Sequence, residues 1–347
     1  MSRQSLRPKS RLEDLPAEII QEIFFQCLEI NLPRASAAIA SALSNVTIYM
    51  WLVQLAFSAA EGRGDILTQG FLPGRHVFDC MRSAEIGQLR TRILECRWCT
   101  LPLIRSCQLV FLNHVFKCLG PELVIVPDDQ HHLAGFTGWF DNLGPCNKEY
   151  YNRRDDSDLL LRANRQGHGS KGSESESSHD YDVAVWFNFG TIQISSARNK
   201  TFSGQSLFQL PFCHKTYVPD KLLHPPWTEE KLDFLQVLSP GAILDEDIDV
   251  PRATHTLRDL IQTRDFVTFT RLLRMSVRMD RYAGTSCWPT RNIIFWSALK
   301  HSSGKDDPFI RLLVEERWEH IESGDIRLKE KLLKNYSVGT VNESQNS

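Results

Sequence analysis

The sequence predicts an α+β protein that is mainly α-helical, with a helical block near each end and a small β-sheet between them. In residues 11–60 and 231–336, apolar side chains recur every three or four positions, which is the spacing of one helix face. The intervening residues 61–230 contain two runs rich in β-branched and aromatic residues, "LVIVP" and "VAVWFNFGTIQIS", which are typical of strands. At 347 residues the chain is long enough for two or three domains.

The composition is that of a folded protein without a dominant charge. Hydrophobic residues make up 42% and charged residues 24% of the chain, which separates it from disordered proteins. The formal charge of -2, from 40 basic and 42 acidic residues, gives no field that would attract nucleic acid or an anionic membrane. The first ten residues contain no apolar signal segment, so we expect the nine cysteines to be reduced thiols in the cytoplasm or nucleus.

The first helix is expected to begin near Asp14, a favourable N-cap residue, with Pro16 and Glu18 in its first turn, and to end before Pro33. One wide apolar face should look inward. It comprises Leu15, Ile19, Ile20, Ile23, Phe24, Cys27 and Leu28. Phe25 is the exception, because it falls on the polar side of the helix.

Residues 35–60 carry no charged side chain and are longer than the roughly 20 residues that span a bilayer. Serine, asparagine and glutamine side chains interrupt this run, and its first half is mostly alanine and serine. We therefore expect two short helices, 35–43 and 48–57, packed into a core or against a partner rather than in a membrane. The polar segments 1–10 and 337–347 are expected to be disordered tails.

The central region is expected to combine helices with a few strands. Residues 66–119 have a mainly helical pattern, and 123–127 should form a short strand. Residues 162–182 are rich in glycine, serine and charge, so we expect a flexible insertion there. The following apolar run predicts buried strands with a bend at Gly190.

The C-terminal block is expected to be helical from an N-cap at Thr228 to Tyr336. It contains a weak repeat, because pairs of apolar residues close a helix near Leu238, Leu273 and Leu313. These landmarks are about 35 and 40 residues apart, which resembles the roughly 33-residue period of ankyrin repeats. The alternative is an ordinary helical bundle.

One cluster of residues has the spacing of a metal site. Cys96 and Cys99 form a Cys-x-x-Cys pair, and His114 and Cys118 stand one helical turn apart, so the four could complete a tetrahedral zinc site. The same positions also follow the core spacing of an apolar helix, in which a buried cysteine acts as a small hydrophobe. The spacing leaves both interpretations open.

No other pattern predicts catalysis. The acidic runs 153–158 and 245–249 lack the glycine and the terminal glutamate of a calcium loop. The chain has no phosphate-binding glycine loop, no Gly-x-Ser-x-Gly elbow and no His-Glu-x-x-His helix. We therefore expect a protein that is not an enzyme, with no cofactor and no small-molecule ligand.

The stretch "LEDLPAEIIQEIFFQCLEINLPRASAAIASALSNVTIYMWLVQLAF" resembles an F-box. The resemblance covers about 45 residues, with Leu15, Pro16 and Ile19 at its opening and Trp51 and Phe57 near its end. It departs from the family pattern in the middle, where "SALSNVT" replaces a Cys-Lys-x-Trp segment. The segments "CRWCTLP", "VWFNFGTIQI" and "PDKLLHPPWTEEKLDFL" look like those of F-box-like proteins of filamentous fungi.

The resemblance implies a three-helix module that docks on a Skp-family adaptor in a cullin-based ubiquitin ligase, while the rest of the chain recruits a protein substrate. The partner-binding residues would be Leu15, Pro16, Ile19, Ile23, Phe25 and Leu28. In that case Phe25 should stand partly exposed in the isolated protein. The alternative is a stand-alone interaction module with ankyrin-like repeats, in which the N-terminal helices serve only the chain's own core.

Overall fold

The structure is a computed structural model of the chain. It describes residues 11–58, 80–119, 123–135, 138–139, 157–165, 179–198, 202–208, 210, 215–244, 251–279 and 285–336. Both expected tails, 1–10 and 337–347, lie outside these residues. The fold is mixed and mainly helical, as the sequence predicts.

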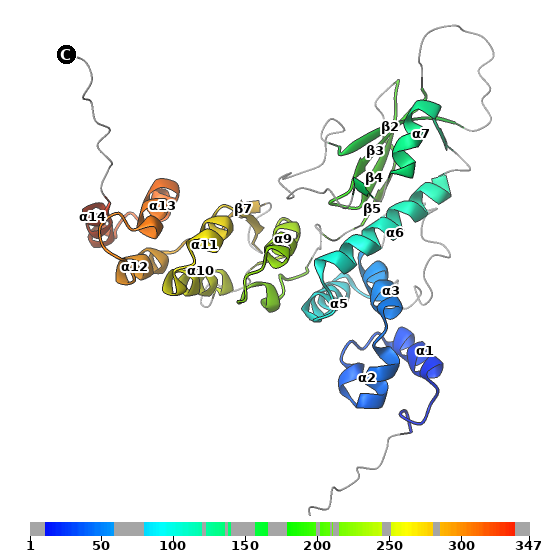
Figure 1. Ribbon diagram of the computed structural model, residues 1–347, viewed down its shortest axis with the longest axis horizontal. Coiled ribbons are helices and arrows are strands. Elements are labelled where there is room, and N and C mark those ends of the chain that lie inside the picture. The colour runs from blue at the N-terminus through cyan, green and yellow to red at the C-terminus, as the bar shows by residue number, and fades with distance from the viewer. Residues whose placement is uncertain are drawn as a thin grey trace, which may run out of the picture.

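Three arms diverge from a common junction (Figure 1). The first arm contains α1 (Ala17–Cys27) and α2 (Ala37–Leu43), and the second contains a five-stranded sheet. The third, which we name the C-terminal arm, runs from α9 (Glu229–Leu238) to α14 (Ile326–Asn335). Helices α3 (Val46–Phe57), α5 (Ser83–Glu95) and α6 (Leu101–Leu119) lie where the arms meet.

The first arm starts differently from the sequence expectation. Pro16 occupies the N-cap position of α1 and no side chain caps the helix, so the expected cap by Asp14 is wrong. Asp14 lies two residues too early, whereas a capping side chain must reach the second or third amide of its own helix. Downstream, Ser36 caps α2 and Asn45 caps α3.

The uncharged stretch forms two short helices, as expected. α2 and α3 are bent by 71° relative to each other. No single helix in the described part of the chain has both the length and the apolar character to cross a membrane; this bent pair would pass on length and composition alone.

α3 connects the first arm to the junction. Its residues from Trp51 to Phe57 are all buried, and it packs against α5 and α6. Arg90 Nε of α5 donates a 2.7 Å hydrogen bond to Ala56 O, and the Phe57 ring stacks on Phe208 with centroids 6.1 Å apart. The third helix of the N-terminal block, residues 11–60, is therefore shared with the central region.

The second arm is an antiparallel meander in the order β1-β2-β3-β4-β5. Its strands are β1 (Leu123–Ile125), β2 (Leu159–Arg165), β3 (Tyr181–Trp186), β4 (Thr191–Ser196) and β5 (Phe202–Leu207). α6 packs against β4 on one face, and α7 (Pro127–Ala134) follows β1. Gly190 makes the expected bend with φ 57°, and a Cβ there would lie 2.7 Å from Phe208 Cβ, so glycine fits both constraints.

The predicted boundaries of the flexible insertion, 162–182, are wrong at both ends. Arg162–Arg165 complete strand β2, while Tyr181 and Asp182 begin β3 and pair with β2. The polar composition of these strand ends made them resemble a loop. Arg162 is polar, but in the strand it pairs with Asp129 of α7 at 2.9 Å. Residues 166–178 lie outside the described part of the chain.

The C-terminal arm is a row of stacked helix pairs. α10 (Arg252–Thr263) packs on α11 (Phe266–Leu273), and α12 (Asn292–Lys300) packs on α13 (Pro308–Arg317). The pairs stack in order, since α10 contacts α12, α11 contacts α13, and α14 contacts α12 and α13. A hairpin of β6 (Ser276–Arg278) and β7 (Thr285–Cys287) lies between the two pairs in the chain. The prediction that this block is helical throughout is therefore wrong at the hairpin.

Thr228 caps α9 through Lys231 N, as the sequence predicts. All three repeat landmarks, Leu238, Leu273 and Leu313, are fully buried. They belong to a connected core that continues from Ile20 in α1 to Leu332 in α14. The three arms are therefore joined by continuous apolar packing.

Candidate partner-binding surface

α1 and the residue before its N-cap present a row of apolar side chains to solvent. Leu15 is 38%, Ile19 47% and Ile23 37% exposed, and Cys27 is also exposed. Ile19, Ile23 and Cys27 are four residues apart, so they lie along one ridge of the helix, and Leu15 stands just before the N-cap Pro16. The sequence predicts an inward position for all four side chains, and that prediction is wrong.

The buried side of α1 is narrow. Ile20 and Phe24 are each 2% exposed, and Gln21 Nε2 donates a hydrogen bond to Ala42 O of α2 at 2.9 Å. α2 and Trp51 of α3 lie on this side. Because an eleven-residue helix with neighbours on one side can bury only one stripe, the rest of its wide apolar face stays at the surface.

The remaining predicted partner residues differ in their surroundings. Pro16 is exposed at the start of α1. Phe25 is half-buried, with its ring centroid 4.2 Å from that of Trp51. Leu28 is only 5% exposed and takes a left-handed conformation, φ 49°, where α1 ends. Leu28 is therefore part of the core, whereas Phe25 is packed by the chain on one side and still partly accessible.

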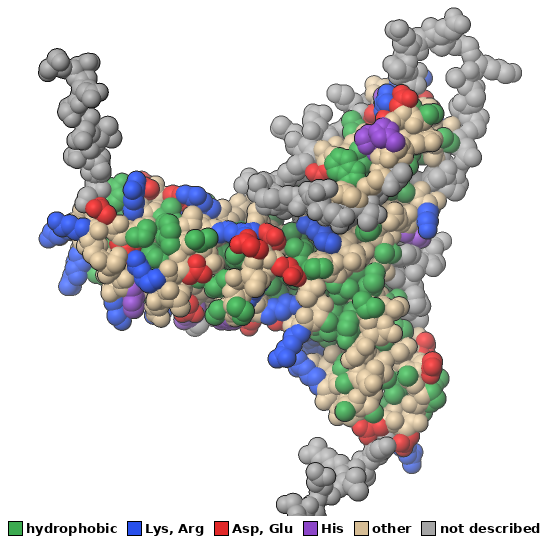
Figure 2. Space-filling model, in the orientation of Figure 1, with side chains coloured by type: hydrophobic (Ala, Val, Ile, Leu, Met, Phe, Trp, Pro, Cys, Tyr) green, Lys and Arg blue, Asp and Glu red, His purple; other side chains and the backbone are tan. Residues whose placement is uncertain are grey.

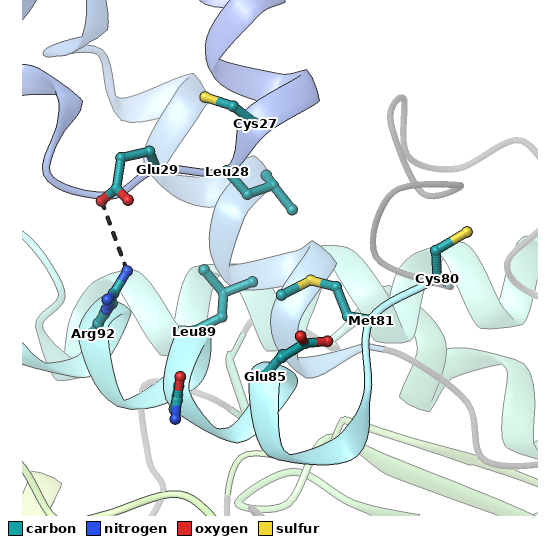
Figure 3. Close-up of a pocket in the computed structure, with 9 residues that line it drawn as sticks. Cys27, Leu28, Glu29, Cys80, Met81, Glu85, Leu89 and Arg92 are labelled. Atoms are coloured by element: carbon teal, nitrogen blue, oxygen red, sulfur yellow. Dashed lines mark ion pairs between the residues drawn. The ribbon is translucent and has the colours of Figure 1, made fainter.

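A pocket of about 380 Å³ lies where the exposed ridge reaches the central region (Figure 3). One wall comes from the end of α1 and the two residues after it, and the other from one side of α5 and the residues before that helix. Lining residues are Cys27, Leu28, Glu29, Cys80, Met81, Glu85, Gln88, Leu89 and Arg92. Arg92 Nη1 and Glu29 Oε1 pair across it at 3.7 Å, and because both side chains are about half exposed the pair adds little stability.

Sequence reasoning missed this pocket. Its two walls are more than fifty residues apart in the chain, and no local spacing relates them. The amphipathic pattern of α5 predicts that Leu89 is buried, and Leu89 is 5% exposed. The pattern does not predict which residues lie on the opposite wall of the pocket. Val46 at the start of α3, 60% exposed, was also missed.

A close joint connects α5 to the segment 215–221 that leads into the C-terminal arm. A Cβ on Gly87 would lie 2.4 Å from Lys215 O, so only glycine allows this approach. One turn later, Thr91 Oγ1 accepts a hydrogen bond from Tyr217 N at 3.1 Å. The backbone of the segment is thus held directly against the helix.

Lys221 completes this joint. Its Nζ donates to Cys96 O and to Cys99 O, each at 2.6 Å, beyond the end of α5. Burial lowers the pKa of Lys221, and the neighbouring cysteines and Glu95 oppose that shift. The lysine therefore satisfies two carbonyl groups of the Cys-x-x-Cys turn and fixes its conformation.

The four candidate zinc ligands do not come together. His114 Nε2 and Cys118 Sγ are 3.4 Å apart on α6, whereas Cys99 is fully buried in the turn that Lys221 holds. Burial raises the pKa of the Cys99 thiol to about 12, which disfavours the thiolate that a metal needs. Within the described ranges, no group of three or more His, Cys, Asp or Glu side chains is placed to hold a metal ion. The cysteines pack as core residues.

The exposed apolar surface around α1 is therefore the candidate site in the described part of the chain. The exposed ridge of α1 is apolar, lies on an arm of the molecule and ends at a pocket. Comparison with known proteins found no match to any family model, curated protein or solved structure.

Proposed function

We propose that the chain is a substrate-recruiting F-box subunit of a Skp/cullin-type ubiquitin ligase. The observation that carries the proposal is the exposed apolar surface formed by Ile19 and Ile23 on α1 and by Leu15 just before its N-cap. Large apolar side chains aligned at helical spacing are the anchors that helix recognition uses. The adaptor would cover this ridge and the open side of Phe25.

The other two arms are then available for the recruited protein. In the C-terminal arm, helix pairs stack in order with a hairpin between them, which supports a degenerate ankyrin-like module. Catalysis would belong to other subunits of the ligase, and the chain itself would act without a cofactor in the cytoplasm or nucleus.

The test is co-purification of the full chain with a Skp-family adaptor. Wild type is expected to bind, and the double variant Leu15→Asp with Ile19→Asp is expected to lose at least about tenfold in affinity, because each change puts a charge into an apolar contact. Val267→Asp is the matched control, since Val267 is 77% exposed on α11. Equal binding by all three proteins, or no binding by wild type, would contradict the proposal.

A second candidate is a stand-alone interaction module in which the N-terminal helices only complete the core. The burial of α3 against α5 and α6 favours it. This candidate predicts that no adaptor binds, and that the α1 variants are as stable as wild type because their side chains reach solvent. Both outcomes are measured in the same co-purification, combined with thermal unfolding.

A further inference from the structure

The last described helix of the C-terminal arm, α14, has one face that no described residue covers. α14 packs on α12 and α13 through Leu328 and Leu332, which are both fully buried. On its other side Ile326 is 65% and Leu333 56% exposed. The end of a helical stack normally has a polar outer face, so these two side chains form an apolar stripe without a cover among the described residues.

The exposed surface of α14 is also basic. Arg327, Lys331 and Lys334 are exposed, Lys329 is half-buried, and Glu330 is the only acidic residue in the helix. None of these four cations pairs with a carboxylate in the described part of the chain. Figure 2 shows Lys and Arg side chains gathered around this end of the arm.

Two of these cations are fixed by aromatic rings. Lys331 Nζ lies 5.0 Å from the centroid of Trp296, and Lys329 Nζ lies 6.0 Å from that of Trp318. A cation over a ring loses some freedom without losing its charge. Part of the positive charge of α14 is therefore pre-organised.

The two properties run side by side along the helix. Ile326 and Leu333 are seven residues apart and share one stripe. Arg327 and Lys334 are also seven apart and form a basic stripe about 100° round the axis, with the exposed Glu330 between the two stripes. A complementary surface has an apolar stripe beside a row of carboxylates. An acidic amphipathic helix has this pattern.

We propose that the outer face of α14 binds an acidic amphipathic helix of another protein, which extends the stack of helices. A second copy of this chain is a poor occupant, because two basic faces would repel each other. Residues 337–347 are also poor occupants, since they contain a single acidic side chain, Glu343. This surface of α14 is present whether or not the chain binds an adaptor. If the partner helix belongs to the protein to be ubiquitinated, that assignment rests on the function proposed above.

The experiment measures binding of the full chain to a labelled peptide by fluorescence anisotropy. The probe is a helical peptide of about 18 residues with a leucine stripe flanked by glutamates, and its partner probe has lysines in place of the glutamates. The glutamate peptide is expected to bind at least about tenfold more tightly than the lysine peptide, and to weaken as salt is raised.

Three variants localise the site. The double variant Arg327→Glu with Lys334→Glu, and separately Leu333→Ser, are each expected to weaken binding of the glutamate peptide at least about tenfold. Arg97→Glu with Lys117→Glu is the control, with the same change of charge at exposed positions near α5 and on α6. Circular dichroism and adaptor co-purification of the variants should match wild type, which separates failure here from failure of the F-box proposal.

Several outcomes would overturn the inference. Equal binding of the two peptides, or equal effects of the control and α14 variants, would show that the outer face of α14 does not recognise an acidic helix. A gain of more than about tenfold on deletion of residues 337–347 would identify the tail as the occupant, and a dimer dissolved by Leu333→Ser would identify a second copy. Tighter binding to phosphatidylserine vesicles than to the peptide would identify a membrane surface.

Discussion

Asp307 is the most demanding electrostatic site of the C-terminal arm. Its carboxylate is fully buried and accepts hydrogen bonds from Arg264 Nη2 at 2.7 Å, Ser303 N at 2.9 Å and Phe309 N at 3.0 Å. Burial alone would raise the pKa of Asp307, but the hydrogen bonds together hold it below its usual value. The residue therefore caps α13 and links it to the end of α10.

The substitution Asp307→Asn removes the charge and keeps the size of the side chain. Breaking a buried ion pair by removing one partner costs about 3 to 5 kcal/mol. Arg264 is 35% exposed and can regain water, which places the expected cost near the lower end, about 3 kcal/mol. Asp306→Asn is the control: Asp306 is exposed and has φ 64°, a conformation that asparagine accepts.

The assay is urea unfolding of 5-fluorotryptophan-labelled protein, followed by the fluorine signal of Trp288, which is fully buried within the arm. Asp307→Asn should lower the free energy of unfolding of the arm by about 3 kcal/mol, and Asp306→Asn by less than about 0.5 kcal/mol. A double-mutant cycle with Arg264→Met should give a coupling above about 1 kcal/mol. Similar losses for both aspartates, or strictly additive effects of Asp307 and Arg264, would refute the reasoning.

The pH dependence gives an independent check. Because the folded-state pKa of Asp307 is lowered, its contribution is complete above the ordinary aspartate pKa, about 4, and disappears as pH falls through the folded-state value. The difference in stability between wild type and Asp307→Asn should therefore narrow below about pH 4. A difference that stays constant into acid would mean that the charge is not responsible.

Three further changes test the junction of the arms. Gly87→Ala should cost about 2 kcal/mol and speed amide exchange in α5, because its Cβ would press on Lys215 O at 2.4 Å. Lys221→Met should cost about 2 kcal/mol by removing two carbonyl hydrogen bonds, and should raise the alkylation rate of the buried Cys99, whereas an unchanged rate would contradict its role. Deleting residues 1–60 should expose the surface that α3 covers on α5 and α6, which increased binding of a hydrophobic dye would detect; no increase would mean that the N-terminal block, α3 included, detaches cleanly.

The sequence by itself determined the local features of this protein. The short strand at Leu123, the bend at Gly190 and the cap at Thr228 all appear where the pattern predicts them. Each depends on residues within a few positions of one another, through side-chain spacing, a left-handed φ or a cap hydrogen bond. The mainly helical α+β class follows from the sum of such local preferences.

Only the tertiary structure decided which apolar side chains are buried. The periodicity of α1 shows that Ile19 and Ile23 lie near Ile20 and Phe24, but not that α2 and α3 cover only the latter two. The same holds for Arg162, whose polarity suggests a loop until Asp129 of α7 is placed beside it. Burial is a property of pairs of surfaces, and the partner surface lies elsewhere in the chain, so local spacing cannot specify it.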